Sequence, residues 1–255
     1  MAAEVSTSLR HHVLVTGSAG AIGRSVVKEL LARGHRVRGL DLRPTPDLED
    51  FVTGPISDRD LVEAAVAGTT AIVHLAATVD DADFMTELLP NNIVGVYNIF
   101  AAALQQGVKR VALASSMQVT SGLPKTAYAQ MVAPTEAAPT NGYAVTKLFA
   151  EDLGHMFWLR HHIEVVCARI GFLPRDAVTA AKFEKHPHIQ NVYLSHADAG
   201  RFFACAVEAP NVGYAVLWAT SRRPNAIGYD LAPSKAAIGY EPQDHFPEGL
   251  EFPFP

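Results

Sequence analysis

Tyr143 and Lys147 are the side chains whose types and spacing first suggest chemistry. They stand four residues apart in NGYAVTKLFAE, which places both on one face of a helix. A free phenol, with a pKa of about 10, is a poor base at neutral pH, but a nearby ammonium group favours the phenolate. The pair therefore predicts proton transfer by Tyr143 with help from Lys147. Taken alone, this spacing is more typical of a solvated helix face.

Two serines bear on the choice between a catalytic pair and a solvated helix face. Ser115 and Ser116 end the apolar run RVALASS, which has the character of a strand buried on both faces. Ligands of open α/β sheets bind at the carboxyl edge of the strands, where these hydroxyl groups would lie. Their position favours the catalytic interpretation of Tyr143 and Lys147.

A glycine loop precedes these residues in the chain. TGSAGAIG places Gly17, Gly20 and Gly23 between an apolar strand pattern and a helix pattern. Such a loop is either a tight turn or a surface of bare backbone N–H groups that binds a pyrophosphate at the positive end of the helix dipole. The surrounding strand, helix and second strand favour a dinucleotide site.

Asp41 ends the second expected strand, 18 residues after Gly23. A carboxylate there can accept hydrogen bonds from an adenosine ribose and would repel the 2′-phosphate of NADP. Arg43 could instead bind that phosphate, but we expect it on the adenine face or in solvent. The sequence therefore favours NAD over NADP as the cofactor.

The elements that must position these residues alternate regularly. Strand-length apolar runs and helix-length periodic segments follow one another, which predicts an α/β fold with a Rossmann-type doubly wound parallel sheet. The expected strands are 12–16, 36–42, 71–77, 110–116, 163–170 and 214–220. The expected helices are 22–34, 57–68, 91–107, 141–162, 196–210 and 231–242.

Residues 172–195 lack a clean period and are predicted to form a loop or flap. We expect Ser57 or Asp58 to cap helix 57–68. At the start of helix 196–210, we expect Ser195 or Asp198 to act as the cap and as the acidic residue of the first turn. The chain is interpreted as one domain, 1–255, with a small C-terminal part, 171–255, that supplies most of the substrate-binding elements.

Composition excludes several classes of function. The 255 residues are 49% hydrophobic with a formal net charge of −5, so the chain has no basic field for nucleic acid. No stretch has the roughly 18 apolar residues of a membrane span, and the N-terminus lacks a signal-peptide pattern, so we expect a cytoplasmic protein. The histidines lack metal-ligand spacing, and Cys167 and Cys205 are expected to be buried, reduced thiols.

An ordered set of motifs resembles the extended short-chain dehydrogenase/reductases. TGSAGAIG, Asp41, HLAA, NNIVG, ASSMQV and YAVTK follow one another over about 170 residues. The resemblance implies that Ser116 binds the reacting oxygen, Tyr143 exchanges its proton, Lys147 holds the nicotinamide ribose, and Asn92 supports the lysine through water.

The resemblance also implies two sets of binding residues. NAD would contact Gly17, Gly20, Ala21, Ile22, Asp41, Leu42, Ile56, Leu75, Ala76, Ala77, Asn92, Ser115, Tyr143, Lys147 and Ile170. The substrate would contact Thr78, Ser116, Met117, Gln118, Tyr143, Phe172 and Arg175.

The C-terminal third resembles the uronate dehydrogenases within that family, in RIGF, LSHADAGRFFACAVEAP, YAVLWATS and IGYEP. This implies a small sugar or sugar-acid substrate oxidised at a secondary or anomeric hydroxyl group, with a uronate giving an aldarolactone. Arg175, Lys182 and Lys185 are candidates for binding a carboxylate.

Two alternatives remain at this point. A nucleotide-sugar epimerase or dehydratase shares the fold, but only 108 residues follow Lys147 and no acidic pair follows the serines. A non-catalytic NAD-sensing regulator would typically lack Tyr143 or Lys147. The resemblance also implies a homo-oligomer that pairs through helices 91–107 and 141–162.

Overall fold

Seven parallel strands form the centre of the protein in the order β3-β2-β1-β4-β5-β6-β7. The computed structural model describes residues 10–123, 136–223 and 229–250. The strands are β1 His12–Thr16, β2 Arg36–Asp41, β3 Phe51–Thr53, β4 Ala71–His74, β5 Arg110–Ser116, β6 Glu164–Ile170 and β7 Tyr214–Ala219. The predicted Rossmann-type fold is confirmed, and the sheet gains the short edge strand β3, which the sequence did not predict.

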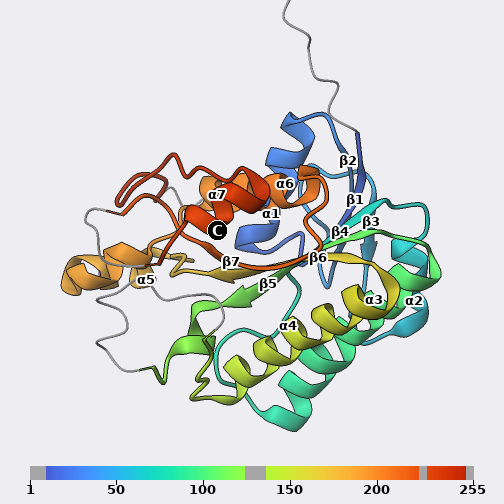
Figure 1. Ribbon diagram of the computed structural model, residues 1–255, viewed down its shortest axis with the longest axis horizontal. Coiled ribbons are helices and arrows are strands. Elements are labelled where there is room, and N and C mark those ends of the chain that lie inside the picture. Colours follow the sequence, from blue (N-terminus) through green and yellow to red (C-terminus); the bar gives the residue numbers. More distant parts are fainter. Residues whose placement is uncertain (1–9, 124–135, 224–228, 251–255) are drawn as a thin grey trace, which may run out of the picture.

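Helices cover both faces of the sheet. The helices are α1 Ala21–Ala32, α2 Arg59–Val66, the π-helix η1 Phe84–Val94, α3 Gly95–Gln105, the 3-10 turn η2 Met117–Thr120, α4 Gly142–His161, α5 Ala177–Lys185, the 3-10 segment η4 Pro187–Val192, α6 His196–Glu208 and α7 Ala232–Ile238. Figure 1 shows α1, α6 and α7 on one face and α2, α3 and α4 on the other, with α5 beyond the edge of the sheet.

Alternate residues of each strand divide between two cores. Val13 and Val15 of β1 pack with α1 and α6, whereas Leu14 packs with α2 and α3 on the opposite face. All three side chains are fully buried. This alternation within a continuous apolar run is the pattern of a parallel strand with helices on both sides.

The order of the strands creates a crevice. The chain runs from β1 outward through β2 to β3 and then returns to β4 on the other side of β1. Connections from neighbouring strands therefore leave in opposite directions at the carboxyl ends of β1 and β4, and ligands bind at such a switch point.

The prediction of a loop over 172–195 was wrong. This segment contains α5 and η4, and α5 begins with a capping box in which the Asp176 carboxylate accepts from the Thr179 N–H. Phe183 is the one buried residue of α5, so the helix shows no apolar stripe in the sequence.

The predicted helix 91–107 also differs from the structure. A π-helix begins seven residues earlier, at Phe84, where Asp83 caps it, and continues directly into α3. Pro90 lies inside the π-helix, which is why the sequence suggested a later start.

The structure also tests the predictions for the helix caps and the two cysteines. Asp58 rather than Ser57 caps α2, and Ser195 caps α6 by accepting from the Asp198 N–H. Cys167 is buried, but Cys205 is only partly buried, and neither forms a disulfide. A Pro-, Thr- and Ala-rich stretch follows β5 in the sequence, and most of it, 124–135, lies outside the described residues.

Two structural findings concern other kinds of site. Within the described ranges, no helix is long and apolar enough to cross a membrane. The same residues contain no group of three or more histidine, cysteine or acidic side chains that could hold a metal ion.

Candidate active site

One cleft of about 730 Å³ lies at the carboxyl ends of β1, β4, β5 and β6. Twenty of the residues predicted to bind cofactor or substrate line it. They are Gly17, Gly20, Ala21, Ile22, Asp41, Leu42, Ile56, Leu75, Ala76, Ala77, Thr78, Ser115, Ser116, Met117, Gln118, Tyr143, Lys147, Ile170, Phe172 and Arg175. The fold thus brings together residues that are spread over about 160 positions of the chain; their individual roles stay predictions.

The glycine loop is built for close backbone contact. Gly17 has a φ of 69°, and a Cβ there would lie 2.9 Å from the backbone nitrogen of Ala76. At Gly23 a Cβ would lie 2.0 Å from the carbonyl oxygen of Gly17. Side chains at these two positions would force the loop and α1 away from the sheet.

The start of α1 offers free hydrogen-bond donors to the cleft. Gly20 occupies the N-cap position and has no side chain to cap the helix, and the first turn, AIGR, contains no acidic residue. The N–H groups of Ala21 and Ile22 have no acceptor within the helix, and both residues line the cleft. These features fit the pyrophosphate of a dinucleotide.

Asp41 lies at the rim of the cleft, at the end of β2. Its carboxylate accepts from the backbone N–H of Ala19, over 3.0 Å, and from that of Arg43, over 3.2 Å. The carboxylate is therefore fixed beside the glycine loop, where it could accept from the hydroxyl groups of an adenosine ribose. Arg43 is exposed, as expected.

Replacing Asp41 by asparagine should weaken NAD binding about tenfold, because it removes a charged hydrogen-bond acceptor. It should also narrow the preference for NAD over NADP, because the repulsion of a 2′-phosphate by the carboxylate is lost. Titrating the protein with NADH and NADPH by fluorescence measures both affinities. Glu49→Gln removes an exposed charge outside the cleft and should leave both unchanged. An unaltered ratio of the two affinities in Asp41→Asn would contradict the assignment.

Tyr143 lies in the first turn of α4 and is only 8% exposed. Asn141 caps this helix by accepting from the Ala144 N–H, and its amide also donates to the Gln118 side chain across the cleft. Burial raises the pKa of Tyr143 to about 12, and a hydrogen bond with the Ser116 hydroxyl acts against that rise. The phenol therefore needs a further positive charge nearby before it can act as a base.

Lys147, on the next turn of α4, is the predicted source of that charge. Its Nζ atom lies 5.5 Å from the centre of the Tyr143 ring and donates to the Ala114 carbonyl oxygen over 2.9 Å. Burial lowers the pKa of Lys147 to about 8, so the side chain is still mostly charged at neutral pH. The cleft thus contains a phenol and an ammonium group on one wall, as the sequence predicted.

The two serines at the end of β5 point in different directions. Ser116 accepts from the Gln118 N–H and hydrogen-bonds Tyr143, so its hydroxyl lies among the reactive groups. Ser115 also lines the cleft, but its hydroxyl donates to the Glu151 carboxylate over 2.5 Å. This alternation follows from the pleat of the strand and supports Ser116 as the reactive serine.

Asn92 was predicted to contact the cofactor, but it is not among the described residues that line the cleft. Its Oδ1 atom accepts from the Thr78 N–H, and its Nδ2 atom donates to the Thr78 carbonyl and to the Thr146 hydroxyl. The predicted cofactor contact of Asn92 is therefore not supported by its position. Its predicted support of Lys147 through water stays a prediction.

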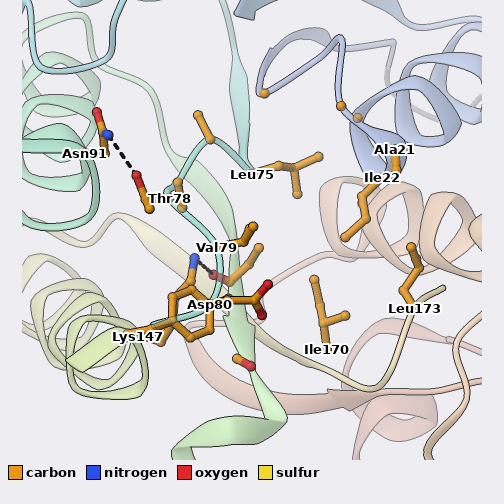
Figure 2. Close-up of a pocket in the computed structure, with 18 of the residues that line it drawn as sticks. Ala21, Ile22, Leu75, Thr78, Val79, Asp80, Asn91, Lys147, Ile170 and Leu173 are labelled. Atoms are coloured by element: carbon orange, nitrogen blue, oxygen red, sulfur yellow. Dashed lines mark hydrogen bonds between the residues drawn. The ribbon is translucent and has the colours of Figure 1, made fainter. Parts of the chain in front are cut away.

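The neighbouring Asn91 lines the cleft instead and was not predicted. Its amide donates to the Thr78 hydroxyl over 2.8 Å, as Figure 2 shows. The wider turn of a π-helix allows both Asn91 and Asn92 to reach the Thr78 segment, which an α-helix would not favour. The NNIVG motif indicated an asparagine at the site, but the sequence could not show which of its two asparagines faces the cleft.

Asp80 was missed as well. Its carboxylate forms an ion pair with Arg175 over 2.7 Å, and both residues line the cleft. The acidic run TVDDAD was visible in the sequence, but nothing in it indicated that one carboxylate would meet an arginine 95 residues away.

Comparisons with known proteins show which family the chain resembles. The model of the NAD dependent epimerase/dehydratase family matches residues 13–173. The chain is 30% identical to an NAD-dependent glucose-6-phosphate dehydrogenase of Haloferax volcanii, over 92% of this chain and 94% of that protein. It is 28% identical to a uronate dehydrogenase of Pseudomonas syringae pv. tomato, over 92% of this chain and 82% of that protein.

Solved structures show the same likeness. The structure superposes on a point variant of uronate dehydrogenase from Agrobacterium tumefaciens in complex with NAD, with a TM-score of 0.79. The two chains are 28% identical, and the match covers 92% of this chain and 86% of that chain.

Proposed function

Because the chain belongs to the NAD-dependent epimerase/dehydratase family, we propose that it is an NAD-dependent dehydrogenase that oxidises the anomeric hydroxyl group of a sugar acid. NAD is its cofactor, and it acts on CH–OH groups as its relatives do. The observation that carries the proposal is the meeting of Ser116, Tyr143 and Lys147 in the same cleft as the bare backbone of α1.

The mechanism follows from these side chains. When bound, NAD would accept the hydride that leaves the carbinol carbon of the substrate. The Tyr143 phenolate takes the proton of the substrate hydroxyl group, while Ser116 donates a hydrogen bond to the same oxygen as it becomes a carbonyl. Lys147 favours the phenolate through its positive charge.

Arg175 supports an anionic substrate. It was one of three candidates for binding a carboxylate, and Lys182 and Lys185 belong to α5 outside the described lining of the cleft. A guanidinium group matches the geometry of carboxylate and phosphate groups. The substrates named for the two relatives, a uronate and glucose 6-phosphate, both carry such a group.

The expected result of mixing the purified protein with NAD and a panel of uronic acids and neutral aldoses is NADH formation with a uronic acid. NADH absorbance follows the turnover, and NMR of the product should show an aldarolactone. Epimerised sugar without net NADH would instead support the epimerase alternative. NAD binding without turnover of any panel member would support the regulator.

The predicted homo-oligomer and cytoplasmic location also remain proposals. Several large apolar side chains of α3 and α4 are exposed, which supports pairing through these helices. They are Tyr97, Leu104, Val145, Phe149 and Leu159.

A further inference from the structure

An ion pair between Asp80 and Arg175 lies in the lining of the cleft that also contains Tyr143. Asp80 follows β4 on one side, and Arg175 precedes α5 on the other, with 2.7 Å between the carboxylate and the guanidinium group. The side chains are 61% and 48% exposed, respectively. Figure 2 shows Asp80 among the residues that line the cleft. Arg175, which we propose binds the anionic group of the substrate, is therefore already paired with a carboxylate of the protein itself.

The Asp80 side is held in place by its neighbours. Asp80 itself has a φ of 62°, in the left-handed region that few residues other than glycine, asparagine and aspartate adopt. The next residue, Asp81, accepts from the N–H of Gly142, the first residue of α4. The backbone around Asp80 is thus tied to the helix that carries Tyr143.

The Arg175 side is anchored independently. The Arg175 N–H donates to the Thr179 hydroxyl within the capping region of α5, and the preceding carbonyl, that of Pro174, contacts the His196 ring over 2.9 Å. Phe183 fixes α5 to the protein, with its ring 4.9 Å from that of Phe172. Because both backbones are fixed, the two charges face each other before any substrate arrives.

Both charges also act on the reactive phenol. Asp80 raises the pKa of Tyr143 and Arg175 lowers it, although burial has the larger effect. The ion pair is therefore close enough to the reactive group for a bound substrate to reach Arg175 and Tyr143 together.

Building on the proposed function, we propose that Asp80 competes with the anionic group of the substrate for Arg175 and thereby sets the preference between anionic and neutral sugars. An exposed ion pair is weak, so a substrate carboxylate can displace Asp80 at small cost. A neutral sugar offers no replacement for Asp80 and leaves the pair intact. The wild-type protein would then bind anionic substrates less tightly than Arg175 alone allows.

The test compares the wild-type protein with Asp80→Asn on a hexuronate and on the neutral hexose of the same configuration. We expect the KM for the hexuronate to fall by about two- to fivefold, the range that an exposed ion pair is worth, with the KM for the hexose unchanged. Asparagine tolerates the left-handed backbone of Asp80, so the variant should fold.

Two further variants test the role of Arg175 and the effect of removing an unrelated charge. Arg175→Gln should raise the KM for the hexuronate and affect the hexose much less. Glu184→Gln removes an exposed charge of α5 outside the cleft and should match the wild-type protein. In Asp80→Asn the lower limb of the pH profile of kcat/KM should move to lower pH, because a charge that raises the pKa of Tyr143 is gone.

Other outcomes would overturn the inference. A higher KM for both sugars in Asp80→Asn would make Asp80 a ligand of sugar hydroxyl groups. An unchanged KM for the hexuronate in an otherwise active variant would exclude competition. If the wild-type protein oxidises neither sugar with NAD, the proposed function fails first, and if it oxidises only neutral sugars, the role of Asp80 fails while the dehydrogenase stands.

Discussion

Replacing Tyr143 by phenylalanine should lower kcat by about 10²- to 10⁴-fold, the usual contribution of a general base, while NAD binds as before. The change removes one oxygen atom from a residue that is 8% exposed and leaves the ring in its place on α4. Stopped-flow and steady-state assays of NADH formation measure kcat, and titration calorimetry with NAD measures the affinity.

Tyr97 provides a matched control for this variant. It is a tyrosine of α3 with 53% exposure, outside the cleft, so Tyr97→Phe should keep full activity. Turnover in Tyr143→Phe equal to that of Tyr97→Phe would refute the role of the phenol.

Replacing Glu151 by glutamine should lower the free energy of unfolding by about 3 kcal/mol or more, because it leaves a buried cation without its counter-ion. The Glu151 carboxylate and the Arg169 guanidinium group lie 2.8 Å apart, with side chains 3% and 2% exposed. Ser115 donates to the same carboxylate. Urea denaturation of the variant and the wild-type protein measures the difference.

Two comparisons separate this loss from a general effect of removing a charge. Asp152→Asn changes the next residue of α4, whose side chain is less buried, and should leave stability within about 0.5 kcal/mol. The double variant Glu151→Leu with Arg169→Met replaces both charges with apolar groups and should recover most of the lost stability. A stable Glu151→Gln protein would mean that water or another group already compensates Arg169.

Much of the fold and of the site could be predicted because both depend on local patterns. Gly17 adopts a φ of 69°, and neither Gly17 nor Gly23 has room for a Cβ, so the sequence records the requirement for glycine directly. The spacing of Tyr143 and Lys147 likewise follows from one turn of helix. These features then meet in one cleft because the carboxyl ends of parallel strands share one edge of the sheet.

The parts that could not be predicted depend on contacts between distant segments. Phe183 is the one residue of α5 described as buried, so the helix shows no periodic apolar face. The choice between Asn91 and Asn92 depends on a π-helix, whose wider turn has no clear signature in the chain. The pairing of Asp80 with Arg175 depends on how far the start of α5 reaches across the sheet edge.

Asn92 and Asn91 bind different parts of Thr78. Asn92 binds the main-chain N–H and carbonyl of residue 78, whereas Asn91 contacts only its hydroxyl group. The side chain of residue 78 can therefore be exchanged without loosening the peptide that carries it. Substitutions at residues 78 and 91 would therefore change the lining of the cleft while the main chain at residue 78 stays in place.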